Sequence, residues 1–243
     1  MLKSKIMEFL LQPETYISLI TLTFLEIVLG IDNIIFISII TDRLPEENQK
    51  RIRTIGLLLA LVMRIILLSL ITVIIQLKEP LFTISEFNFS VRDLILVAGG
   101  MFLLAKSVSE IHEKIEGAHE QQVAKKKNTV ASIILQIIVL DIVFSFDSIL
   151  TAVGLSNHLS IMITAVVLAM IVMIYFVEMI SRFIKKHPTL QILALSFLIL
   201  IGFMLVIDGF HFEVPKGYIY FALFFSVMVE IINMKIRKKS GAH

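Results

Sequence analysis

Residues 25–35 of this chain read LEIVLGIDNII, and residues 140–150 read LDIVFSFDSIL. Five of the eleven positions are identical, and Glu26 aligns with Asp141 as a conservative pair. Each copy lies inside a long apolar stretch, and each carries two carboxylates that are six residues apart. This duplicated acidic motif indicates both the class of fold and the place where a functional site is expected.

The composition is that of a membrane protein. The chain has 243 residues, of which 57% are hydrophobic and 17% are charged, and its mean hydropathy is +0.92. Soluble domains are roughly 45–50% apolar and about 25% charged. These values argue against a soluble enzyme, a nucleic-acid-binding protein and a disordered scaffold. The absence of Cys excludes disulfides, zinc–thiolate sites and iron–sulfur clusters.

Seven apolar stretches are long enough to cross a membrane as helices, which takes about 20 residues for roughly 30 Å of hydrocarbon. They are continuous rather than alternating, so a transmembrane β-barrel is not expected. The sequence predicts an all-α polytopic membrane protein with seven transmembrane helices. These cover residues 16–40, 54–77, 94–111, 130–155, 160–182, 189–210 and 217–235.

Basic residues predict the orientation, because Lys and Arg accumulate in cytoplasmic loops. With seven spans, five Lys and Arg residues fall on the side of the N-terminus and fifteen on the other side. The N-terminus is therefore expected outside and the C-terminus in the cytoplasm. The predicted location is the cell membrane.

The two motif copies are separated by three helices, so they are expected to cross the membrane in opposite directions, as in an inverted repeat. A looser similarity links GGMFLLAK (99–106) with IGFMLVID (201–208). We expect one transmembrane domain over residues 1–243. It would comprise a three-helix repeat (12–111), a charged cytoplasmic linker (112–129), a second three-helix repeat (130–210) and a seventh helix (217–235).

The motif carboxylates need a reason to lie in the membrane, where each one costs about 2.5–3.5 kcal/mol on insertion scales. On a regular helix Glu26 and Asp32 would point about 240° apart, whereas Glu26 and Asn33 would nearly share a face. We expect both helices to be interrupted at the small residues Gly30 and Ser145. Unwound backbone at that depth is tolerated where it lines a polar cavity.

Together the two copies offer a metal site made only of oxygen ligands. Such ligands favour the hard cations Mn²⁺, Mg²⁺ and Ca²⁺ over Cu⁺ or Zn²⁺. A plainer alternative is that some carboxylates are protonated, or are tied to Arg64 and merely hold helices together. The candidate metal ligands are Glu26, Asp32, Asn33, Asp141, Asp147 and Ser148.

Two intramembrane cations are predicted to support the site. Arg64 lies near the centre of the second span, so an acidic partner is expected. Lys106 lies nearer the cytoplasmic end, where it would either pair inward or extend to the membrane surface. If both pair inward, the four carboxylates keep two negative charges, which match one divalent ion. Lys106 is also a candidate internal counter-ion after the metal leaves.

The remaining intramembrane charges are less specific. Glu178 precedes Arg182 by four residues, so a simple helical ion pair is expected. Asp208 lies near the outer surface, where it would collect ions or be solvated. Glu230 would either line a pathway or serve in packing or capping.

Three segments resemble the TerC family of integral membrane proteins, and within it the bacterial YgdQ-like branch. They are FLEIVLGIDNIIFISI (24–39), GGMFLLAKSVSEIHE (99–113) and LDIVFSFDSILTAVGL (140–155), and the likeness extends over about residues 12–235. The resemblance implies a role in tellurite resistance or manganese export, or in supplying Mn²⁺ to secreted enzymes. It also implies a metal-site role for the six candidate ligands at the motif positions.

The sequence therefore predicts a secondary transporter that exports a divalent cation, first of all Mn²⁺, with Ca²⁺ and Mg²⁺ as alternatives. The sequence contains no phosphate-binding loop that would indicate an ATP motor, and no pair of nucleophile and base that would indicate an enzyme. Closely spaced carboxylates release protons when metal binds, so protons are the expected exchanged ion. No permanent cofactor is expected, and the oligomeric state stays open. Two other functions also stay open: a metal-delivery factor acting with the secretion machinery, and an exporter of small organic cations.

Overall fold

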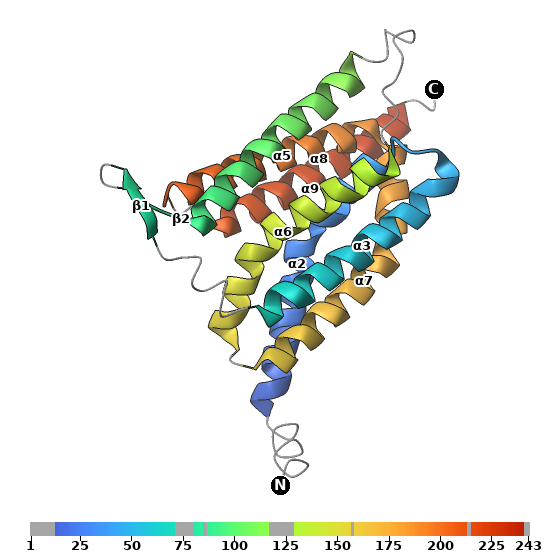
Figure 1. The fold of residues 1–243 in the computed structure, drawn as a ribbon. Helices are drawn as coiled ribbons and strands as arrows, with labels where there is room; N and C mark the ends of the chain where they lie inside the picture. The colour runs from blue at the N-terminus through green and yellow to red at the C-terminus, as the bar shows by residue number, and fades with distance from the viewer. Residues whose placement is uncertain are drawn as a thin grey trace. The chain divides into compact units, whose positions relative to one another are not determined.

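The computed structural model of the chain describes residues 13–70, 80–84, 87–116, 129–156, 158–212 and 215–240. This part is helical apart from one two-stranded sheet (Figure 1). The helices are α2 (Pro13–Thr41), α3 (Glu46–Ser69), α5 (Val91–Ile115), α6 (Val130–Leu155), α7 (Leu159–Lys186), α8 (Pro188–Gly209) and α9 (Lys216–Ser240). Each expected span overlaps one of these helices, although α3 begins at Glu46 rather than near residue 54.

Local sequence signals explain where several helices begin. At the start of α5, the hydroxyl of Ser90 accepts a hydrogen bond from the backbone N–H of Asp93, and the Asp93 carboxylate accepts one from the backbone N–H of Ser90. Pro45 directly precedes α3, and Pro188 is the first residue of α8. Proline is tolerated at a helix start because the first N–H groups have no partner within the helix.

A short hairpin precedes α5, in the stretch between the second and third expected spans. Strand β1 (Pro80–Ile84) pairs with strand β2 (Phe87–Ser90). The expectation of an all-α membrane protein is confirmed for the described spans, and the hairpin is a short addition between two of them that the sequence did not predict. The reason is local: Phe, Thr and Ile favour extended backbone, and helical hydropathy patterns do not detect so short a run.

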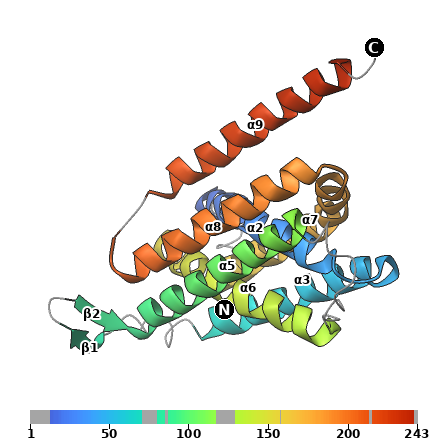
Figure 2. The ribbon, with the colours of Figure 1, turned by 90° about the horizontal axis from the view of Figure 1, so that it is seen from above.

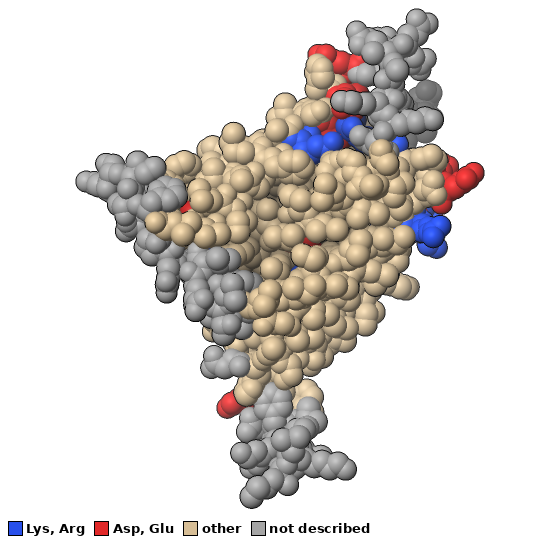
Figure 3. All heavy atoms as spheres, viewed as in Figure 1, with Lys and Arg blue, Asp and Glu red and all other residues tan. Residues whose placement is uncertain are grey.

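Six helices in the described part are long and apolar enough to cross a membrane: α2, α3, α5, α7, α8 and α9. In α6 the corresponding apolar stretch is the shorter Val130–Phe146. Charged side chains are sparse on the face shown in Figure 3, where most of the described surface is neither acidic nor basic. The chain is thus a multi-pass membrane protein, and the number seven for its spans stays a prediction.

The described helices fall into two compact units. The first contains α2, α3, α6 and most of α7. Helices α2 and α3 are antiparallel, because Arg64 contacts Glu26 at one level while Arg53 contacts Thr41 at another. Helix α7 approaches α2 so closely that a Cβ atom at Gly30 would lie 2.3 Å from the sulfur of Met173.

The second unit contains α5, α8 and α9. Helices α5 and α8 are antiparallel and meet at glycines: a Cβ at Gly100 would lie 2.6 Å from the carbonyl oxygen of Gly202, and a Cβ at Gly202 would lie 3.0 Å from that of Gly100. The loose sequence repeat aligns these same two glycines. Figure 2 shows α9 at the edge of this unit, beside α8.

The expected interruption of the two motif helices was wrong. Both α2 and α6 are continuous helices through Gly30 and Ser145, although α6 curves near its middle in Figure 1. The small residues serve other purposes. Gly30 makes room for Met173, and Ser145 is fully buried with its hydroxyl 3.3 Å from a carboxylate oxygen of Asp141.

Candidate functional site

A buried ion-pair cluster lies inside the first unit, where α2, α3 and α6 meet. The guanidinium of Arg64, from α3, donates from Nη1 to Glu26 Oε2 on α2 at 2.7 Å. It also donates to Asp141 Oδ1 on α6, from Nη2 at 3.0 Å and from Nε at 3.2 Å. The three residues are only 2–4% exposed. Charges buried so deeply are tolerated when they are paired and hydrogen-bonded.

Two neutral side chains complete the cluster, and they do so reciprocally. Asn33 Nδ2 on α2 donates to Asp141 Oδ1 on α6 at 3.0 Å. The hydroxyl of Ser148 on α6 donates to the backbone carbonyl of Ser145 at 3.2 Å, and it lies near the Glu26 carboxylate on α2. Because the motif alignment equates Glu26 with Asp141 and Asn33 with Ser148, each copy places a neutral polar side chain near the carboxylate of the other copy. This pattern requires α2 and α6 to run antiparallel.

Regular helical geometry explains which motif residues meet. Glu26 and Asn33 are seven residues apart, so on a continuous helix they differ by only about 20° in direction. Asp141 and Ser148 have the same spacing on α6. In each copy, the two residues that face the cluster are therefore the first carboxylate and the neutral residue.

Asp32 has a different environment. It is 7% exposed, and the described residues provide no hydrogen bond or ion pair to its carboxylate. An acidic side chain buried without a partner within a membrane protein is a marker of an ion or proton pathway. Its counterpart Asp147 belongs to α6, but its side chain lies outside the described part.

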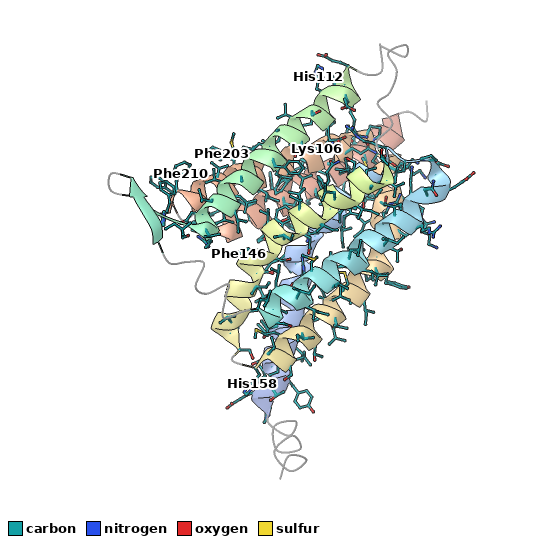
Figure 4. The ribbon with its side chains drawn as sticks, in the orientation of Figure 1. Lys106, His112, Phe146, His158, Phe203 and Phe210 are labelled. Carbon is teal, nitrogen blue, oxygen red and sulfur yellow. The ribbon has the colours of Figure 1, made fainter. Side chains whose placement is uncertain are left out.

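Lys106 is in the second unit, on α5 (Figure 4). Its Nζ lies 3.0 Å from Glu110 Oε1, one helical turn away, and its side chain is 17% exposed. Because this cation is already paired with Glu110, the charge balance that assigned both Arg64 and Lys106 to the motif carboxylates is not supported. Arg64 is the cation that the structure brings to them.

A second buried cluster was missed in the sequence. Arg53 on α3 donates to Glu178 on α7 at 2.8 Å, to Thr41 on α2 at 3.0 Å and to Gln49 at 2.9 Å. Glu178, for which a helical pair with Arg182 was expected, thus binds a cation from another helix, Arg53. The only sequence signal for this cluster is the position of Arg53, which lies on the apolar side of α3 near its otherwise polar start.

Two further acidic side chains of the expected spans form hydrogen bonds within the second unit. Asp208 Oδ2 accepts a hydrogen bond from Arg92 Nη2 at 3.1 Å, so α8 is tied to the start of α5. Thr189 on α8 donates to Glu230 on α9 at 2.6 Å. Of the two roles expected for Glu230, this contact favours packing between helices.

The carboxylates of the motif cluster can bind a cation, and the cation that they bind in this structure is the guanidinium of Arg64. Within the described residues, no group of three or more His, Asp or Glu side chains is arranged to hold a metal ion. Arg64 lies where Glu26 and Asp141 would share one. Two carboxylates and one guanidinium leave a formal negative charge, beside the neutral oxygens of Asn33 and Ser148.

Comparison with known proteins adds the family. The sequence model described as the integral membrane protein TerC family matches residues 11–241. The inner membrane protein YgdQ of Escherichia coli is 50% identical over 228 residues, which cover 94% of this chain and 96% of that protein. A UPF0053 protein of Haemophilus influenzae is 49% identical over 232 residues, 95% of this chain and 98% of that protein.

The inner membrane protein YoaE of Escherichia coli is 47% identical over 238 residues, but this chain spans only 46% of its length. The names of the two Escherichia coli relatives record an inner membrane, and none of the three names records an activity. No solved structure matches the chain significantly.

Proposed function

Because this chain belongs to the TerC family of integral membrane proteins, we propose that it is a secondary transporter that exports a divalent metal cation across the cell membrane. Mn²⁺ is the first candidate, and Ca²⁺ and Mg²⁺ are the alternatives. The observation that carries the proposal is the buried cluster of oxygen ligands contributed by both copies of the motif.

The donor set fits a hard cation. Glu26 and Asp141 offer carboxylate oxygens, and their neighbours Asn33 and Ser148 carry neutral oxygens. Hard divalent cations prefer such ligands, at about 2.1–2.6 Å. The buried Asp32 and its counterpart Asp147 are the further carboxylates that would complete the coordination shell.

The transport step is proposed to be alternating access between two inverted repeats. Two sets of reciprocal neighbours support this proposal. Asn33 lies beside Asp141 of the other copy, as Ser148 lies beside Glu26. Gly100 and Gly202, which match in the looser repeat, approach each other. A pseudo-two-fold axis in the membrane plane would produce such contacts, because it converts each contact of one copy into the matching contact of the other. The site then lies near that axis, where either half can open it.

Protons are the proposed counter-ion. Several carboxylates held close together in a dry environment resist being charged at the same time, and metal binding displaces the protons they keep. The proposal therefore expects Mn²⁺ flux to increase when the destination compartment is more acidic than the source.

The test is Mn²⁺ flux into proteoliposomes that contain a divalent-sensitive dye. The expected result is flux with the wild-type protein and its loss in Asp32→Asn and in Asp147→Asn. Glu14→Gln is a matched control, because Glu14 is an exposed carboxylate on the same helix α2. It removes one negative charge and is expected to leave flux unchanged.

The outcomes separate three functions. Normal flux in both Asp variants would contradict the proposed site. Absence of flux in the wild type, with Mn²⁺ binding that depends on the motif carboxylates, would favour a metal-delivery factor that needs a partner. Flux that small organic cations inhibit and Mn²⁺ does not would favour an exporter of organic cations.

A further inference from the structure

Arg64 occupies the position that a cation shared by the two motif carboxylates would need. Its Nη1 and Nη2 atoms lie on one planar guanidinium, and they bind Glu26 on α2 and Asp141 on α6 at 2.7 Å and 3.0 Å. All three side chains are no more than 5% exposed. The two helices are thus connected by a positive charge that belongs to the chain itself.

A metal ion and this guanidinium cannot use both carboxylates in the same way at the same time. A hard cation needs their oxygens at about 2.1–2.6 Å, so the ion would lie in the space between the carboxylates that the guanidinium now fills. The two positive charges would also repel each other strongly, because so little water reaches the cluster to screen them. Cation binding and the full set of Arg64 contacts therefore exclude each other.

We propose that Arg64 is a tethered competitor of the transported cation: it neutralises Glu26 and Asp141 when the cation is absent, and it is displaced from at least one of them when the cation binds. This inference rests on the proposed transport function, and it adds how the site is regulated. A built-in cation lowers the equilibrium affinity for the substrate. It also neutralises the carboxylates of the empty site, so that the protein can change back to the conformation that binds the next ion.

The competitor is specific to this site. Arg53 is also buried, lies on the same helix α3 and also pairs with a carboxylate, but that carboxylate is Glu178, outside both motif copies. Lys106 pairs with Glu110 in the other unit. Arg64, by contrast, binds one carboxylate of each motif.

The test measures Mn²⁺ binding and Mn²⁺ flux for purified full-length wild type, Arg64→Gln and the matched control Arg53→Gln. We expect Arg64→Gln to bind Mn²⁺ about tenfold more tightly than wild type or better, in the usual range for two ligands coupled at one protein. Its flux is expected to fall, because the loaded site no longer has a cation to displace the metal. Arg53→Gln is expected to lose stability and keep the wild-type affinity for Mn²⁺.

A second variant keeps the test decisive if Arg64→Gln does not fold. Arg64→Ala leaves space for a free guanidinium ion, so millimolar guanidinium is expected to weaken Mn²⁺ binding in this variant and not in the wild type. Arg64→Lys retains the charge but cannot bridge both carboxylates with a planar fork, and its affinity is expected to lie between those of wild type and Arg64→Gln.

Two results would overturn the inference. One is an unchanged or weaker Mn²⁺ affinity in folded Arg64→Gln; the other is guanidinium that does not compete in Arg64→Ala. If wild-type flux is nonetheless lost in Asp32→Asn and Asp147→Asn, only the role of Arg64 fails and the proposed function stands. If the wild type neither binds nor transports Mn²⁺, both fail together.

Discussion

At the scale of single residues, the motif cluster shows how one chain can keep four ionisable groups inside a membrane protein. Glu26 and Asp141 each bind Arg64, while Asp32 lies buried beside Asn33 in sequence without such a contact in the described part. Removing one partner of a buried ion pair typically costs about 3–5 kcal/mol. Replacement of Glu26 or Asp141 is thus expected to affect stability, whereas replacement of Asp32 isolates function more cleanly.

Asn33 offers a test of the correspondence between the two copies. Asn33→Ser installs the residue found at the matching position 148, and Ser can still donate a hydrogen bond and offer an oxygen ligand. We expect this variant to keep Mn²⁺ flux within a few-fold of wild type. Asn33→Leu has a similar volume but no polar atom, and its flux is expected to fall by about tenfold or more. Both are measured in the proteoliposome assay.

Equal flux in Asn33→Leu and wild type would show that the amide is not needed at the site. Thermal unfolding of both variants in detergent is the control, since Asn33→Leu must be folded for its loss of flux to count.

At the scale of helices, close approach is made possible by glycine rather than by helix breaks. Small residues let transmembrane helices pack backbone to backbone, which replaces the hydrophobic driving force that lipid removes. Gly30 admits the side chain of Met173, and Gly100 admits the backbone of Gly202. The two contacts differ in what must move if a methyl group is added.

Gly30→Ala is expected to lower the free energy of unfolding by about 1–3 kcal/mol, because the new Cβ would lie 2.3 Å from the Met173 sulfur. Met173→Ala in the same protein is expected to restore part of that loss, since the atom in conflict is then absent. Unfolding of the two single variants and the double variant in detergent measures the coupling. Strictly additive effects would show that the two residues do not touch.

Gly100→Ala is expected to be more harmful than Gly30→Ala. Its Cβ would meet the backbone oxygen of Gly202 at 2.6 Å, and a backbone cannot rotate away as a methionine can. The control is Gly154→Ala, because nothing lies within 4 Å of a Cβ at Gly154. This control is expected to be neutral or slightly stabilising through helix propensity. An unfolding midpoint for Gly100→Ala equal to that of Gly154→Ala would contradict the close α5–α8 packing.

At the scale of the whole molecule, the predicted topology places the N-terminus outside and the C-terminus in the cytoplasm. The chain contains no Cys, so single cysteines can report the side on which a position lies. Phe212, which follows α8, and Glu116, which follows α5, are both exposed. Under the predicted topology, an impermeant maleimide labels Phe212→Cys in intact cells and labels Glu116→Cys only after permeabilisation. The reverse pattern, or labelling of both from outside, would contradict that topology.

The sequence by itself determined the class of the molecule and the outline of its elements. Long apolar runs can only be helices in a membrane, because every backbone polar group must be satisfied within the segment. Their limits were predicted well where charge or proline ends a run, as at α6 and α8, and less well where a helix extends into water, as at α3. Internal repetition also identified the two acidic motifs, because a repeat can be recognised from the order of residues alone.

Only the tertiary structure decided which side chains meet. Sequence spacing placed Glu26 and Asn33 on one side of a helix, and it predicted an acidic partner for Arg64. It could not indicate that Arg64 would join Glu26 to Asp141, nor that Glu178 would bind Arg53 from another helix. The choice of partner for a buried charge depends on the distance between helices, and glycines such as Gly30 set that distance. Because such contacts form between residues 38 to 125 positions apart, local pattern carries no record of them.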